Sequence, residues 1–142
     1  MGSFKVDGLK DLQEFFGNIA AVPNDVINQM LHAEADIAVK AQKRTAKSML
    51  TGPYAHTPVQ LAAFIAKGKI KNTKDGKSIH IVFKGSRKRV NTSTPNAEIA
   101  FLDEFGKRGQ DPRPFIKTAN EECADEALNA AGKIYDDWLN TL

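Results

Sequence analysis

Disulfide bonds, and metal sites built from several thiolates, are excluded by the composition, because the 142-residue chain contains a single cysteine, Cys123. No apolar run approaches the ~18 to 20 residues that a membrane span needs. The N-terminus also lacks the basic region and apolar core of a signal peptide. We therefore expect a soluble protein of a reducing compartment, with no membrane contact.

Residue patterns that carry out catalysis are also missing. The three histidines, His32, His56 and His80, have no metal-ligand spacing, and no glycine-rich phosphate loop or nucleophile elbow is present. Cys123 lies among small residues, where a thiol usually acts as a small buried hydrophobe. We expect no catalytic residue, no metal and no cofactor, which leaves a toxin-like or hydrolytic enzyme as the least favoured hypothesis.

What the chain does have is the composition of an ordinary folded domain. Hydrophobic residues make up 42% and charged residues 26%, which favours neither disorder nor a fibrous repeat. We expect one domain over residues 1–142, with a flexible N-terminus at 1–6 and a flexible polar loop at 85–94.

Apolar residues spaced three or four apart predict three amphipathic helices. The first covers residues 7–20 and ends at Pro23, and its apolar stripe consists of Leu9, Leu12, Phe15, Phe16 and Ile19. The second begins at Asn24, a good capping residue, and continues to about Leu50, a length of roughly 35 to 40 Å. The last begins at Phe115 and should pack closely against the second through its largely small stripe, Ala119, Cys123, Ala127, Ala130, Ile134 and Trp138.

A β-hairpin and two short helices fill the middle of the chain. The strands are predicted at 69–73 and 78–84, around a turn that contains Asp75 and Gly76. One short helix is predicted from Pro58 to Ala66, and the other follows Pro95 and ends at Gly106. Together these elements predict an α+β fold, in which the second and last helices pack together on one face of a small antiparallel sheet.

Charge is distributed unevenly along the chain. Between residues 67 and 90 there are nine Lys or Arg and one acid, Asp75, whereas from Phe115 onward there are two basic and six acidic residues. A basic stripe is also predicted on the second helix, at Lys40, Lys43, Arg44 and Lys47. A solvated face explains this stripe, but the denser cluster creates a field that a partner can use. Its candidate assembly residues are Lys74, Lys77, Arg87, Lys88 and Arg89.

Residues 94–119, TPNAEIAFLDEFGKRGQDPRPFIKTA, contain the most distinctive motif. A short helix ends in Glu104, Phe105 and Gly106, and after a loop the triplet Arg113, Pro114 and Phe115 leads into the last helix. This motif resembles the signature of the tail-completion, or head-tail joining, proteins of long-tailed bacteriophages and prophages. A fainter likeness is the turn Thr51-Gly52 after the long helix, while Lys107 departs from the threonine that many members have there.

Each position of the motif has an expected structural role. Gly106 can take the left-handed conformation that ends a helix, and Pro114 presets the backbone for the last helix. Phe105 is expected in the core beside Phe115. Arg113 is placed to form an ion pair with Glu104 across the loop.

The resemblance implies a structural virion protein without enzymatic activity. It implies a ring, in the virion a hexamer, at the head-proximal end of the tail. There it would join the tail terminator or tail tube to the head-closure connector, after assembly in the host cytoplasm. Non-specific contact with DNA in the lumen stays open. The alternative from the residues themselves is a small basic nucleic-acid-binding module, although few aromatic residues alternate with the basic ones, as stacking on bases would require.

Overall fold

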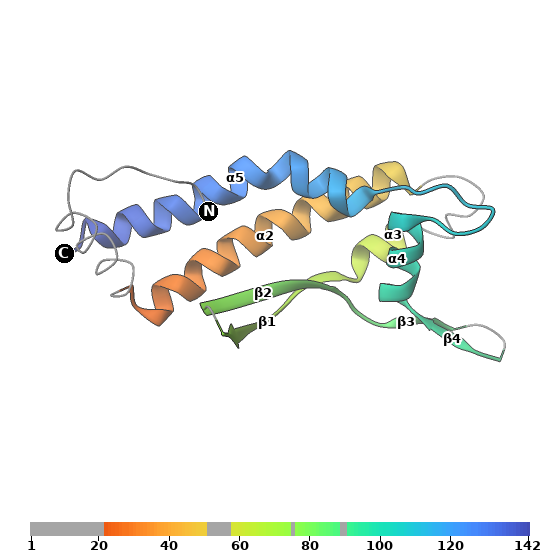
Figure 1. Cartoon of the computed structure of the whole chain (residues 1–142), viewed down its shortest axis with the longest axis horizontal. Helices are drawn as coiled ribbons and strands as arrows, with labels where there is room; N and C mark the ends of the chain where they lie inside the picture. Colours follow the sequence, from red (N-terminus) through yellow and green to blue (C-terminus); the bar gives the residue numbers. More distant parts are fainter. Residues whose placement is uncertain (1–21, 51–57, 75, 89–90) are drawn as a thin grey trace.

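The computed structural model describes residues 22–50, 58–74, 76–88 and 91–142. The molecule is elongated, and two long helices lie side by side along its length (Figure 1). They are α2 (Asn24–Met49) and α5 (Phe115–Leu139). The predicted helix at 7–20 lies outside the described residues.

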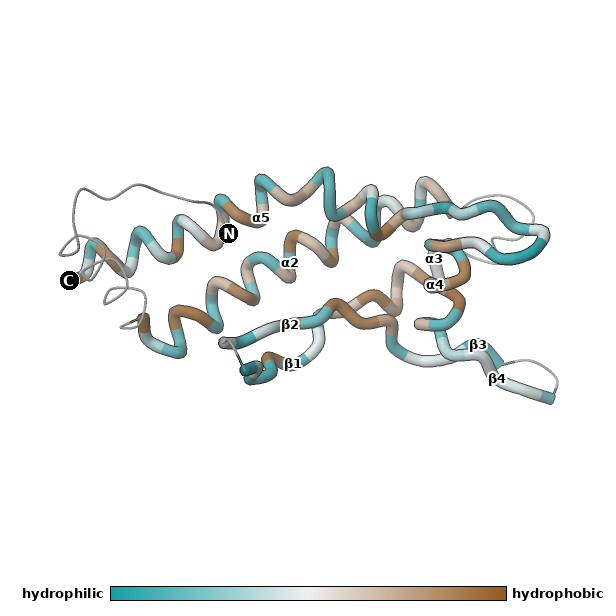
Figure 2. Tube along the Cα trace, in the orientation of Figure 1, coloured by the Kyte–Doolittle hydropathy of each residue, from teal (hydrophilic) through white to brown (hydrophobic). Residues whose placement is uncertain are grey.

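The two long helices run antiparallel and approach closely through small side chains. Ala41 of α2 and Ala119 and Cys123 of α5 form a buried cluster. Small residues at such positions let two backbones come near each other, and a larger side chain there would have to push them apart. Apolar and polar residues alternate along both helices (Figure 2), as an amphipathic period requires. The predicted packing of these helices is confirmed.

An antiparallel hairpin lies on the other side of α2. It consists of β1 (Ile65–Thr73) and β2 (Gly76–Phe83), with Ile65 paired to Phe83 and Thr73 to Gly76. The register shifts between Lys67 and Ile70, as in a β-bulge. The hairpin is longer than predicted, and its turn lies between Thr73 and Gly76. The α+β fold with a small antiparallel sheet is confirmed, and α2 is the helix that chiefly contacts this sheet.

The predicted loop at 85–94 is wrong for five of its ten residues, which lie in strands. Residues Ser86–Lys88 form β3 and Ser93–Pro95 form β4, and the two pair antiparallel with Arg87 opposite Thr94. Gly85, at φ 75°, starts this second hairpin. The polar composition suggested a solvated loop, but strand pairing satisfies backbone groups whatever the side chains are. The described residues therefore contain two two-stranded sheets, where we expected a single sheet.

The helix boundaries differ from the predictions at two places. Helix α3 (Pro58–Ala63) ends three residues early, because Ile65 and Ala66 already pair with β2. Helix α2 begins after Pro23 in the capping position, with no side-chain cap, so Asn24 is its first residue rather than its cap. Helix α4 (Asn96–Phe105) ends at Gly106 as predicted.

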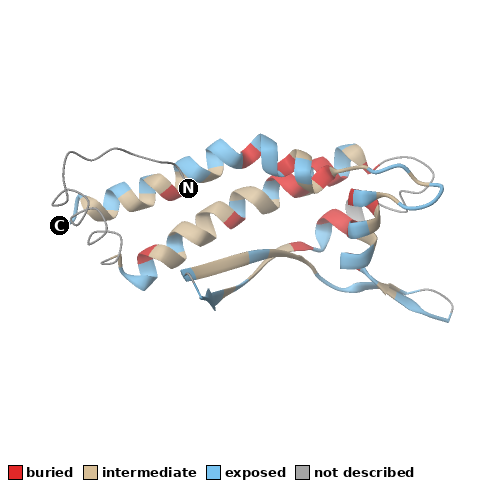
Figure 3. Cartoon of the chain, viewed as in Figure 1, coloured by how far each residue is buried: buried red, intermediate tan, exposed pale blue. Residues whose placement is uncertain are grey.

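The main core lies where α2, α3, α4, α5 and β1 converge, at one end of the molecule (Figure 3). Phe115 is fully buried there, together with Leu50 and Ile65. Its ring meets that of Phe83 edge to face, with centroids 6.0 Å apart. The expectation that Phe105 would lie in the core beside Phe115 is wrong, because 65% of Phe105 is exposed.

Replacing Phe115 with Ala should therefore lower the free energy of unfolding by about 3 to 5 kcal/mol, since it leaves a cavity in the main core. Phe105→Ala is the matched control and should change stability by no more than about 0.5 kcal/mol, as surface substitutions usually do. Urea denaturation followed by circular dichroism measures both. Equal destabilisation by the two variants would contradict this assignment of the core.

Candidate functional site

Two acidic residues at the end of α4 hold the start of α5. The Glu104 carboxylate, which is buried, accepts hydrogen bonds from the backbone N–H groups of Ile116 at 2.8 Å and Lys117 at 2.9 Å. These N–H groups belong to the first turn of α5, where no helical carbonyl is available to them. A negative charge there also matches the helix dipole. Glu104 is thus a cap supplied by a different helix.

The neighbouring Asp103 holds the loop between the helices. Its Oδ1 accepts from Arg113 at 2.7 Å and from the amide of Gln110 at 2.9 Å. The Arg113 backbone N–H donates to the carbonyl of Asp103 at 2.6 Å. The expected ion pair between Arg113 and Glu104 is therefore wrong, because the loop brings the guanidinium to Asp103 while Glu104 turns to α5. We call Asp103, Glu104, Gln110 and Arg113 the α4–α5 latch.

Gly106 is required for the loop to leave α4 in this direction. Its φ is 79°, and its ψ of 172° is extended rather than left-handed helical. A Cβ at this position would lie 2.9 Å from the Gln110 carbonyl oxygen and from the Pro112 ring. The predicted left-handed conformation is therefore wrong in ψ, but both the positive φ and the lack of space favour glycine here.

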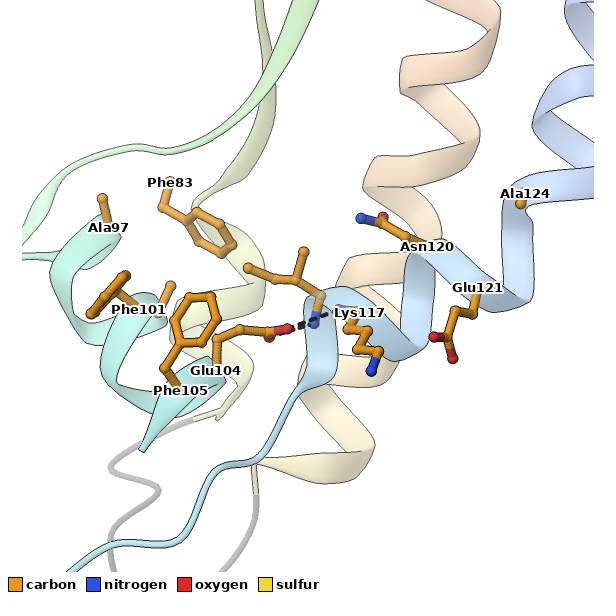
Figure 4. Close-up of a pocket in the computed structure, with 11 residues that line it drawn as sticks. Phe83, Ala97, Phe101, Glu104, Phe105, Lys117, Asn120, Glu121 and Ala124 are labelled. Carbon is orange, nitrogen blue, oxygen red and sulfur yellow. Dashed lines mark hydrogen bonds between the residues drawn. The ribbon is translucent and has the colours of Figure 1, made fainter. Parts of the chain in front are cut away.

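An apolar groove lies beside the latch, between α4 and α5 (Figure 4). Phe101 and Phe105, one turn apart on α4, form its wall, with ring centroids 4.8 Å apart. Both are large and exposed, at 59% and 65%. Phe83, Ile116, Asn120 and Ala124 also line it. We call this feature the α4–α5 groove.

The sequence contained a signal for this groove that the prediction missed. Helix α4 buries Asn96, Ala100, Asp103 and Glu104, whose spacing defines one helix face. Phe101 and Phe105 are four residues apart and fall on a different face. Because carboxylates are rarely buried unless they are paired, the face with two acids was not expected to be the buried one. The exposed position of the two phenylalanines was therefore missed.

The candidate assembly residues of the basic segment, residues 67–90, do not form one cluster. Lys74 is exposed at the tip of the β1–β2 hairpin, and Lys77 donates to Asn28 Oδ1 of α2 at 3.2 Å. Arg87 is half-buried and Lys88 exposed, both in β3. The two hairpins extend toward opposite ends of the molecule, so their charges are separated (Figure 1). Arg89 lies outside the described residues.

Among the described residues, one ion pair joins the basic stripe of α2 to the acidic surface of α5. Arg44 donates to Glu122 at 3.3 Å, and both side chains are more than half exposed. A second exposed pair joins Lys67 of β1 to Asp36 of α2 at 2.9 Å. Exposed pairs of this kind contribute only ~0.2 to 1 kcal/mol each. They orient neighbouring elements more than they stabilise them.

The other residues considered from the sequence are dispersed. His32 lies on α2 and His80 on β2, and His56 is outside the described residues. Cys123 is buried between α2 and α5, as predicted. Within the described ranges, no group of three or more His, Cys, Asp or Glu is placed to hold a metal ion. Over the same ranges, no helix is long and apolar enough to cross a membrane.

Comparison with known proteins gives no match to a protein-family model, to a curated protein or to a solved structure.

Removing the Glu104 cap should loosen the start of α5. Glu104→Ala is expected to lower the free energy of unfolding by about 1 to 3 kcal/mol, because two partly buried N–H groups lose a charged acceptor. Glu98→Ala, an exposed acid on the same helix, is the control and should be nearly neutral. Hydrogen exchange of the Ile116 and Lys117 amides should accelerate only in the Glu104 variant. Unchanged protection of those amides would contradict the capping role.

Proposed function

We propose that this chain is a non-enzymatic assembly protein of a long-tailed bacteriophage or prophage. It forms a ring, in the virion a hexamer, at the head-proximal end of the tail. There it joins the tail terminator or tail tube to the head-closure connector. The proposal rests on the resemblance of residues 94–119 to the tail-completion signature, together with the position of that segment in the fold.

The observation that carries the proposal is the arrangement of Glu104, Phe105 and Gly106 on one side of the loop and Arg113, Pro114 and Phe115 on the other. Five of these six residues have a structural role. Glu104 and Arg113 belong to the latch, Gly106 forms the turn, Pro114 precedes the first residue of α5, and Phe115 lies in the core. Phe105 serves none of them and is exposed. An exposed aromatic residue on a rigidly held helix is typical of a protein contact surface. A structural motif that presents such a surface fits an assembly protein.

The alternative is a small basic nucleic-acid-binding module. Exposed lysines on β1, at Lys69 and Lys71, and on β3, at Lys88, favour it. Against it, the two hairpins separate the basic charge along the molecule, whereas a duplex-binding surface gathers cations on one face. Phosphate contacts also have a measurable signature, a loss of affinity that is linear in log salt concentration, with a slope of about −0.9 per contact.

Inactivating the gene in the phage or prophage that encodes this chain should yield DNA-filled heads and complete tails that remain separate. Electron microscopy of lysates measures this, and a plasmid copy of the wild-type gene should restore joined virions. Normal virions from the null allele would overturn the proposal.

The role of the basic segment in assembly can be tested by complementation, in which a plasmid copy of the gene restores joined virions. Arg87, Lys88 and Arg89 changed together to Ser should reduce the phage titre by about tenfold or more if this segment contacts a neighbouring protein. The matched control, Lys40, Lys43 and Lys47 changed to Ser on α2, removes the same charge and should complement normally.

Duplex DNA affinity of the isolated wild-type protein, measured at low and high salt, separates the two functions. Weak binding is expected from an assembly protein. Tight, steeply salt-dependent binding, with normal joining by the triple variant of residues 87–89, would favour the nucleic-acid module instead.

A further inference from the structure

The α4–α5 groove is an apolar surface that the described part of the chain leaves uncovered. Phe101 and Phe105 expose more than half of their surface, although they lie on a helix that the latch holds in place. Figure 4 shows both rings among the residues that line the groove, with Glu104 directed toward α5. A surface of this kind has the shape and chemistry to receive an amphipathic helix.

The chain itself contains a segment of matching chemistry. Residues 7–20 carry an apolar stripe, Leu9, Leu12, Phe15, Phe16 and Ile19, at helical spacing. Two of these residues are adjacent phenylalanines, the residue type that also forms the wall of the groove. As a helix the segment would be about 21 Å long.

The wall of the same chain's groove, formed by Phe101 and Phe105, is too far away for this helix. Residue 22 adjoins the start of α2, whereas the groove lies at the opposite end of that helix, where Thr45 Oγ1 donates to the Phe115 carbonyl at 2.8 Å. Asn24 and Thr45 are about 32 Å apart along the axis of α2. A 21 Å helix that turns back from Pro23 therefore reaches at most the near edge of its own groove, where Ala124 lies, and ends before the wall of Phe101 and Phe105.

We propose that residues 7–20 of one copy dock in the α4–α5 groove of a second copy. This inference rests on the proposed function, because it specifies the contact that would join subunits into a ring. The segment precedes the N-terminal end of α2 in the chain, whereas the wall of the groove lies near the C-terminal end of α2. Each copy can therefore donate a segment to one neighbour and receive one from another, which is a head-to-tail contact.

A fluorescein-labelled peptide of residues 5–22, titrated with the full-length chain and followed by fluorescence anisotropy, tests the docking directly. Saturable binding is expected, and Phe105→Glu in the chain should weaken it by about tenfold or more. Changing Phe15 and Phe16 of the peptide to Glu should have the same effect. The control is Leu128→Glu, which alters an equally exposed apolar residue of α5 beside a second hollow, near Met30.

Two outcomes would overturn the inference. The first is the absence of saturable binding to the wild-type chain. The second is binding that Leu128→Glu abolishes and Phe105→Glu does not, which would place the segment on the hollow near its own α2. Circular dichroism melts exclude misfolding as a cause, since Phe105 and Leu128 are both exposed.

Mixing two full-length variants tests the direction of the contact. The Phe105→Glu chain keeps a competent segment, and the chain with Phe15 and Phe16 changed to Glu keeps a competent groove. Their mixture should form a two-chain complex that cannot grow, as measured by light scattering. Larger assemblies, or no complex, would contradict a head-to-tail contact.

The complementation assay distinguishes failure of this inference from failure of the proposed function. If the peptide does not bind and the Phe105→Glu chain still joins heads to tails, the docking is wrong and the function stands. If the null allele yields normal virions, the function is wrong whatever the peptide does.

Discussion

The position of α5 depends on its first turn, which is held from two sides at once. Phe115 is fully buried among residues from α2, α3, β1 and α4, and the next two backbone N–H groups are capped by Glu104. Burial fixes where the helix begins, and the cap fixes its direction, because the carboxylate must lie on the helix axis to reach both groups. Since the cap belongs to α4, the same contact sets the angle between α4 and α5, and therefore the shape of the groove between them.

Helix α2 occupies the centre of the fold because it packs on both sides. Toward α5 it presents small residues such as Ala41, and toward the hairpin it meets Ile81 and Phe83. The polar contacts between α2 and the hairpin, from Lys67 to Asp36 and from Lys77 to Asn28, are exposed or partly exposed. Contacts of that kind are weak, so apolar burial near the base of the hairpin holds the sheet and leaves its tip in solvent.

Elements whose apolar residues recur at a regular spacing could be predicted from the sequence. Features that depend on a single contact could not. The long helices follow from apolar spacing, and the first hairpin from alternation around Asp75 and Gly76. The β3–β4 pair was missed because three-residue strands are too short to show alternation. The choice of Asp103 rather than Glu104 as the partner of Arg113 is a matter of one residue on a helix, which turns a side chain by about 100°. Spacing alone brings both acids near the loop and does not choose between them.

The exposure of Phe105 also depends on which face of α4 is buried, and it matters more for function than the partner of Arg113 does. A large apolar residue next to a helix stop is ordinarily a core residue, and from the sequence alone that is the economical assumption. Here the inward face of α4 is taken by Asp103 and Glu104, whose carboxylates are satisfied by Arg113, Gln110 and the N-terminus of α5. Because these polar contacts need the interior side of the helix, Phe101 and Phe105 are left on the outside. The polar contacts that join α4 to the loop and to α5 are thus the reason that these two rings are exposed.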